Sequence, residues 1–158
     1  MDVFSLLMKD HQQVAQLLTT LHEATLRGDR AERQRIFGQI KHELSVHAQV
    51  EEEHVYPVFQ QAEQTSDAAV EALEEHRKLK TLITALESGP DDKTWVSQML
   101  EFKKAVEHHV QEEEQDLFVK GRKVLTPAEA EELGRLVEAA KKEVKGEAPA
   151  PAGGATRN

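Results

Sequence analysis

Apolar residues recur along most of this chain at spacings of three and four, the pattern of helices with one buried face. The pattern predicts four long helices, over about 2–24, 30–61, 67–87 and 91–122. Within the second, Pro57 should kink or thin the last turns, because proline cannot donate a backbone hydrogen bond. The alternation typical of a strand is absent from the sequence. We therefore expect an all-α protein, an antiparallel up-down four-helix bundle with an extra C-terminal helix.

The extra helix has a clear start. Thr126 is followed by Pro127 and, three residues after the threonine, by Glu129, which together form a capping box with proline at the first helical position. Beyond this helix most residues are small, and proline and glycine are frequent, a composition that is typical of disorder. We expect three parts: a four-helix domain over 1–123, a C-terminal helix over 126–145 and a disordered tail over 146–158.

The chain contains an internal repeat. "DHQQVAQLLTTL" (10–21) is similar to "EHRKLKTLITAL" (75–86), and "HAQVEEEHVY" (47–56) is similar to "HVQEEEQDLF" (109–118). The equivalent histidines differ by 76 − 11 = 65 and 109 − 47 = 62 positions, so the halves differ by a small insertion. Each half is a helix pair with one histidine on its first helix and His-x-x-x-Glu on its second. Two such pairs should pack with approximate twofold symmetry.

Four histidines share a helix face with apolar residues three, four or seven positions away: His11, His47, His76 and His109. Glu51 and Glu113 follow one turn after two of these histidines, on the same inward stripe. A histidine on an apolar face is more often a core residue, but burying two carboxylates without compensation is costly. A pair of metal cations would compensate for that cost. Imidazole and carboxylate without thiolate suit iron, manganese or zinc.

The other histidines have different surroundings. His42 and His108 share their faces with polar residues and should be solvated. His22 lies roughly 16 Å along the helix axis from His11, too far to share a site. His54 is one turn past Glu51, so it either contacts the ligands from outside or lies at the surface.

Composition narrows the class of function. The net charge of −9 argues against a nucleic-acid partner, and no apolar run is long enough to cross a membrane. The start of the chain lacks the basic and apolar regions of a secretory signal, and we expect a cytoplasmic protein. No cysteine is present, which excludes disulfides and thiolate metal sites.

Four motifs, in this order and spacing, resemble those of the hemerythrin-like proteins, the HHE cation-binding domain family. They are "DH" at 10–11, "HAQVEEEHVYP" at 47–57, "EEH" at 74–76 and "HHVQEEEQDLF" at 108–118. The resemblance covers roughly residues 1–123 and implies a non-haem di-iron site with an oxo or hydroxo bridge, in which manganese or zinc could substitute. By position it implies that the terminal ligands are His11, His47, His76 and His109. It also implies that the carboxylates bridging the ions are Glu51 and Glu113.

One position departs from the oxygen-carrying members of that family. They have a second histidine one turn after the ligand on the third helix, where this chain has Lys80. We expect at least one metal ion to keep a position for water, peroxide or another ligand. Glu43 is the first candidate for a replacement ligand, and the alternative is that it forms an ion pair with Lys80. The resemblance then implies reaction with dioxygen, peroxide or nitric oxide, including peroxide breakdown. The alternative is a non-enzymatic sensor of iron or oxygen, or a store.

Overall fold

The structure is a computed structural model that describes residues 1–147. Its elements are α1 (Val3–Leu26), α2 (Arg30–Val50), η1 (Glu51–Val55), α3 (Tyr56–Gln60), α4 (Ser66–Glu87), α5 (Asp92–Glu112), η2 (Glu113–Leu117), α6 (Phe118–Val124) and α7 (Pro127–Glu147). The two η segments are π-helical turns inside long helices. No strand occurs in residues 1–147, which confirms the all-α class. α7 includes the first two residues of the expected tail, and 148–158 lie outside the described residues.

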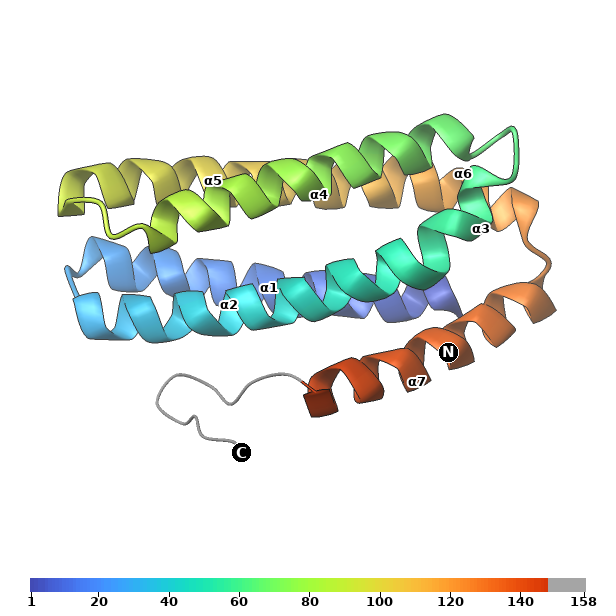
Figure 1. Cartoon of the computed structure of the whole chain (residues 1–158), viewed down its shortest axis with the longest axis horizontal. Helices are drawn as coiled ribbons and strands as arrows, with labels where there is room; N and C mark the ends of the chain where they lie inside the picture. The colour runs from blue at the N-terminus through green and yellow to red at the C-terminus, as the bar shows by residue number, and fades with distance from the viewer. Residues whose placement is uncertain (148–158) are drawn as a thin grey trace. The chain divides into compact units, whose positions relative to one another are not determined.

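The chain divides into two compact units. The first unit contains Met1–Glu51 together with the chain from Glu131, and the second contains Glu52–Ala130. In the first unit α1 and α2 form an antiparallel pair, and in the second unit α4 and α5 form another (Figure 1). Each unit therefore contains most of one half of the internal repeat, although residues 52–56 of the first half belong to the second unit.

Side-chain caps explain where several helices begin. The Asp2 carboxylate accepts a hydrogen bond from the Ser5 N–H at 2.8 Å and so caps α1. At the start of α7, the Thr126 N–H donates to the Glu129 carboxylate at 2.9 Å, and the Glu129 N–H donates to the Thr126 hydroxyl at 3.1 Å. These reciprocal bonds are those of the predicted capping box.

α7 packs closely on the start of the chain within the first unit. A Cβ added at Gly134 would collide with the carbonyl oxygen of Met1 and lie 3.0 Å from the backbone nitrogen of Val3. Val137, one turn later, is fully buried. Glycine is therefore required at this close approach, and the apolar face of α7 is anchored beside it.

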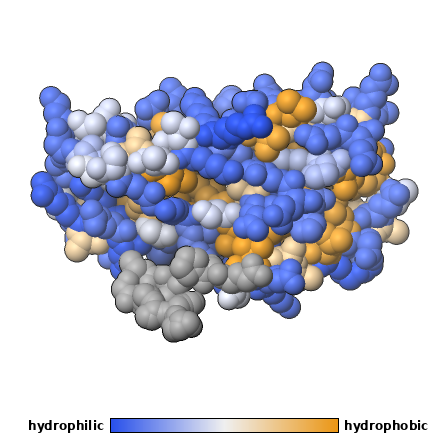
Figure 2. Space-filling view, viewed as in Figure 1, coloured by the Kyte–Doolittle hydropathy of each residue, from blue (hydrophilic) through white to orange (hydrophobic). Residues whose placement is uncertain are grey.

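The apolar faces that the sequence predicts are buried inside the units. In the first unit the largest fully buried side chains are Phe4, Leu7, Leu18, Leu21, Ile36 and Ile40, and in the second they are Tyr56, Phe59, Met99, Phe102, Leu117 and Phe118. The view in Figure 2 shows a mostly hydrophilic surface with smaller hydrophobic areas. Among the helices described, none combines the length and the apolar character needed to cross a membrane.

Candidate metal centre

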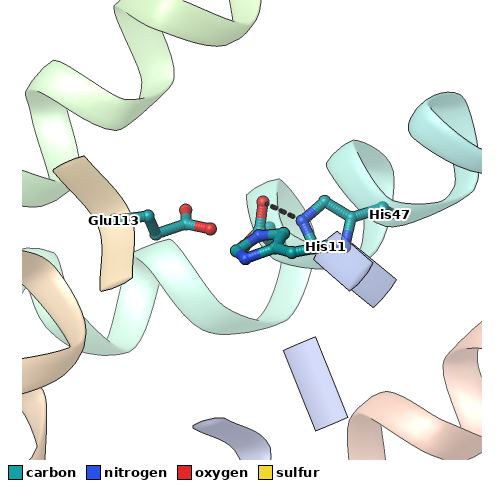
Figure 3. A group of neighbouring side chains, drawn as sticks. His11, His47 and Glu113 are labelled. Atoms are coloured by element: carbon teal, nitrogen blue, oxygen red, sulfur yellow. Dashed lines mark ion pairs between the residues drawn. The ribbon is translucent and has the colours of Figure 1, made fainter. Parts of the chain in front are cut away.

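The first unit brings three of the predicted ligands together. The imidazole rings of His11 and His47 lie side by side, with their centroids 5.0 Å apart (Figure 3). The Nε2 atom of His47 is 3.0 Å from a carboxylate oxygen of Glu51. One ligand atom from each of these residues lies within 4.8 Å of the others, and all three side chains are buried. This spacing suits side chains that surround a common ion.

The far side of the His47 ring is held by a carboxylate from α1. The Nδ1 atom of His47 lies 2.9 Å from Asp10 Oδ2, and the Lys141 ammonium donates to Asp10 Oδ1 at 2.5 Å. Burial would raise the pKa of Asp10, but the hydrogen bonds and charges of His47 and Lys141 outweigh burial and hold the pKa below its usual value. Asp10 is therefore a carboxylate that accepts from the Nδ1–H group, and Nε2 is the nitrogen of His47 that could bind a metal ion.

The second unit repeats the arrangement with the other three predicted ligands. The rings of His76 and His109 are 4.8 Å apart at their centroids, and the Nε2 atom of His109 is 3.7 Å from Glu113 Oε2. Ligand atoms of His76, His109 and Glu113 also lie within 4.8 Å of one another, and these side chains are likewise buried. The structure therefore places one His–His–Glu cluster in each half of the repeat.

Outer carboxylates hold both histidines of the second unit. The Nδ1 atom of His76 is 2.7 Å from Glu52 Oε2, and that of His109 is 2.7 Å from Glu75 Oε1. Glu75 is the repeat equivalent of Asp10, since 75 − 10 = 65. The sequence alone assigned no role to these outer carboxylates. Asp10 and Glu75 had a signal, because an acid precedes the histidine in both halves of the repeat, but no such signal marks Glu52.

A buried tyrosine distinguishes the second cluster. The Tyr56 hydroxyl donates a hydrogen bond to Glu113 Oε2 and lies 3.1 Å from the Nε2 atom of His76. Its repeat equivalent is Phe118, since 118 − 56 = 62, and phenylalanine has no hydroxyl. Tyr56 was not predicted as a site residue, although this difference between the two halves could have drawn attention to it.

Both π-helical turns begin at a candidate ligand. η1 begins at Glu51 and η2 at Glu113, so they share the 62-residue offset of the repeat. We predicted that Pro57 would disturb the second helix, but its repeat equivalent is Val119, which retains the backbone donor. Proline is therefore not the common cause. Such turns widen a helix by one residue and often occur at functional sites, where they redirect a side chain.

Lys80 does not point into the cluster of its unit. Its ammonium lies 3.6 Å from Glu52 Oε1, and 63% of its side chain is exposed. Glu43, the proposed replacement ligand, is half-buried one turn before His47. Among the described residues, Glu43 does not belong to the group of ligand atoms around His11 and His47.

The remaining histidines lie outside the two clusters. His108 is exposed, as predicted, and its Nε2 atom lies 3.4 Å from the Glu75 carboxylate. His42 and His22 are half-buried, so the prediction that His42 is solvated holds only in part. His54 has a 3.9 Å contact with its neighbour Glu53.

Comparison with known proteins identifies the family. The model of the hemerythrin HHE cation binding domain matches residues 2–120. The chain is also 30% identical over 149 residues to a protein named DNA nickase from Nostoc sp. (strain PCC 7120 / SAG 25.82 / UTEX 2576). That alignment covers 92% of this chain and 40% of the relative, so the chain spans about two fifths of its length. No solved structure matches.

The family model covers 120 − 2 + 1 = 119 of the 158 residues. Both of the buried His–Glu clusters fall inside that span, and their donor atoms indicate a metal-ion site. The helical architecture agrees with the same family, with α7 as the extra C-terminal helix. The chain belongs to the hemerythrin HHE cation-binding domain family.

Proposed function

We propose that this chain is a non-haem di-iron protein that reacts with dioxygen, peroxide or nitric oxide. The observation that carries the proposal is the pairing of Nδ1 with a carboxylate at His47, His76 and His109. In metal sites the non-ligating nitrogen of a histidine almost always donates to such an acceptor, which fixes the tautomer and the orientation of the ring. A solvated, charged helix face would not need a carboxylate at the Nδ1 atom of three buried histidines.

The donor set fits a pair of ions. Glu51 and Glu113 have no exposed side-chain surface, and a buried carboxylate costs several kcal/mol unless a cation compensates for it. In our proposal each cluster would hold one iron ion, with Glu51 and Glu113 as the carboxylate ligands. Imidazole and carboxylate suit iron, manganese and zinc, and the family resemblance favours iron. Bound iron would supply the electrons and the exchangeable coordination positions for small oxidants.

The residues of the second cluster would hold and move protons. The Tyr56 hydroxyl touches both Glu113 and His76, so it can donate a proton toward a small molecule bound there or recover one from it. Lys80, in contrast, is exposed and lies 3.6 Å from Glu52 Oε1.

Anaerobic loading with iron(II) tests this proposal. We expect two iron atoms per chain, because the repeat supplies two equivalent ligand sets. On mixing with air, the reduced protein should oxidise without a spectral change that reverses under vacuum, and the oxidised protein should convert peroxide to water and oxygen. One tightly bound metal per chain, or none, would contradict the di-iron proposal.

A non-enzymatic sensor or store of iron is the alternative within the same site. It predicts that iron loading changes the stability of the protein while peroxide is not consumed. Comparing peroxide consumption by the loaded protein with that by an equal concentration of free iron separates the two functions.

The name of the Nostoc relative makes DNA nicking a second candidate, which the 30% identity favours. The net charge of −9 opposes it, because DNA-binding surfaces are usually basic. Incubating supercoiled plasmid with the iron- or manganese-loaded protein at low salt tests it. Nicking that persists when peroxide is removed by catalase would support the candidate.

A further inference from the structure

Lys141, which lies outside the residues matched by the family model, contacts the carboxylate that holds the candidate ligand His47. Lys141 belongs to α7, which begins after the last matched residue. Its ammonium lies 2.5 Å from Asp10 Oδ1, while the other oxygen of Asp10 lies 2.9 Å from His47 Nδ1. Side-chain exposure falls along this series, from 19% at Lys141 to 10% at Asp10 and 5% at His47. The contact therefore leads from the surface into the first cluster.

In the second unit, the carboxylate that holds the equivalent histidine, His109, has a different partner. Glu75 holds His109 at 2.7 Å, and its other oxygen lies 3.4 Å from His108. His108 is 65% exposed and belongs to the same helix as His109. Asp10 is instead held by a lysine from a separate helix. Within the first unit, therefore, an outer carboxylate contacts α7.

We propose that Lys141 is a positioning residue for His47, acting through Asp10. Its ammonium fixes the rotamer of the Asp10 carboxylate, and the carboxylate then fixes the tautomer and the plane of the imidazole. Gly134 and Val137 anchor α7 independently of this contact, so the lysine is held where it can act. The C-terminal helix is thereby part of the support of the metal site.

An ordinary ion pair would behave differently. Such pairs contribute little to stability and have no direct effect on ligand affinity. A positioning role instead predicts an effect on His47 that requires Asp10. Lys142 provides the matched control, because it is an exposed lysine next to Lys141 on the same helix.

The first measurement uses the metal-free full-length chain, so it does not depend on the proposed function. Nitrogen-15 NMR of the histidine side chains reports the tautomer of His47 and the exchange of its Nδ1 proton. We expect a single tautomer with slow exchange in the wild type and in Lys142→Met. In Lys141→Met the exchange should accelerate and the second tautomer should appear. Identical spectra in all three proteins would overturn the proposal.

The second measurement rests on the proposed function and uses cobalt(II), which is stable in air, as the probe. We expect Lys141→Met to bind one of the two ions about 3- to 10-fold more weakly, less than the roughly 10- to 100-fold loss typical of removing a direct partner of a ligand, because Lys141 acts through Asp10. Lys142→Met should bind as the wild type does. In an Asp10→Asn background, Lys141→Met should have no further effect. Additive losses would overturn the positioning role. Absence of cobalt binding by the wild type would contradict the proposed function alone, and the NMR result would still decide the role of Lys141.

Discussion

The pairing of imidazole with carboxylate is the feature on which the candidate site depends at the residue scale. A carboxylate at Nδ1 fixes the tautomer of a buried histidine and lowers the entropy lost when Nε2 binds an ion. Asp10 and Glu75 supply this contact at equivalent places in the repeat. Removing one partner of such a buried pair leaves the other unsatisfied, which costs about 1–3 kcal/mol.

Two adjacent histidines should respond oppositely to truncation. His109→Ala removes a buried ring that lies against Glu75 and near Glu113, so we expect loss of about one bound metal ion per chain. His108→Ala removes an exposed ring whose contact with Glu75, at 3.4 Å, water can replace, so metal content should be unchanged. Metal analysis after iron loading measures both. Equal metal loss in the two variants would show that the inward face of α5 is assigned wrongly.

Tyr56→Phe removes one hydroxyl and nothing else. Glu113 and His76 lose a buried hydrogen-bonding partner, so we expect the metal-free protein to lose about 1–2 kcal/mol of its free energy of unfolding. We also expect slower peroxide consumption by the iron-loaded variant. Urea unfolding and peroxide assays test the two effects. Phe59→Leu, a buried aromatic change nearby in sequence, controls for packing. Unchanged stability and activity in Tyr56→Phe would exclude Tyr56 from the site.

Whether a contact of the candidate site could be predicted from the sequence depends on how far apart its two residues are along the chain. His47 and Glu51 are one helical turn apart, so helix periodicity alone predicts that they meet. The contact of Glu52 with His76 joins separate helices, and no spacing rule contains it. Lys141 reaches Asp10 across 131 positions, which only the docking of α7 brings about. Local geometry was predictable, and the outer contacts depend on tertiary packing.

At the scale of secondary-structure elements, caps and breaks were predictable and π-helical turns were not. The reciprocal bonds of Thr126 and Glu129 follow from residue type and spacing. Gly28, with φ of 70°, ends the first helix in a conformation that glycine adopts readily. The turns at Glu51 and Glu113 have the composition of ordinary helix, so their widening has no sequence signal of its own.

Deleting Gln115 tests the purpose of the second π-helical turn. A π-helical turn acts as an insertion of one residue in an α-helix, so removing an exposed residue from η2 should restore regular helix. We expect helical content to persist, because Leu117 and Phe118 keep their inward phase. Metal binding should fall, because Glu113 loses its orientation. Circular dichroism and metal analysis measure these outcomes, with Gln115→Ala as the control. Full metal binding by the deletion variant would show that the π turn is dispensable.

For the whole molecule, the repeat explains why each compact unit contains one His–His–Glu cluster. The offset of 62 relates both the His-x-x-x-Glu motifs and the two π-helical turns. The family match ends at residue 120, whereas the first unit includes the chain from Glu131. The sequence predicts that the C-terminal helix is a part separate from the four-helix domain. That division stays a prediction, although the contacts of Gly134 and Lys141 show α7 packed within the first unit.

Metal removal should destabilise the whole molecule. Glu51 and Glu113 are buried in separate units, and without a cation both units retain the cost of a buried carboxylate. An ion that binds only the folded chain stabilises it by about 2.7 kcal/mol at a free concentration of 100 times Kd. We therefore expect chelation to lower the midpoint of thermal unfolding by at least about 5 °C. Differential scanning calorimetry of the manganese-loaded and metal-free proteins measures this shift. His109→Ala should show a smaller shift than the wild type, and His108→Ala the same one. Equal midpoints with and without metal in the wild type would mean that the buried carboxylates are compensated by the protein itself, and that the clusters are structural.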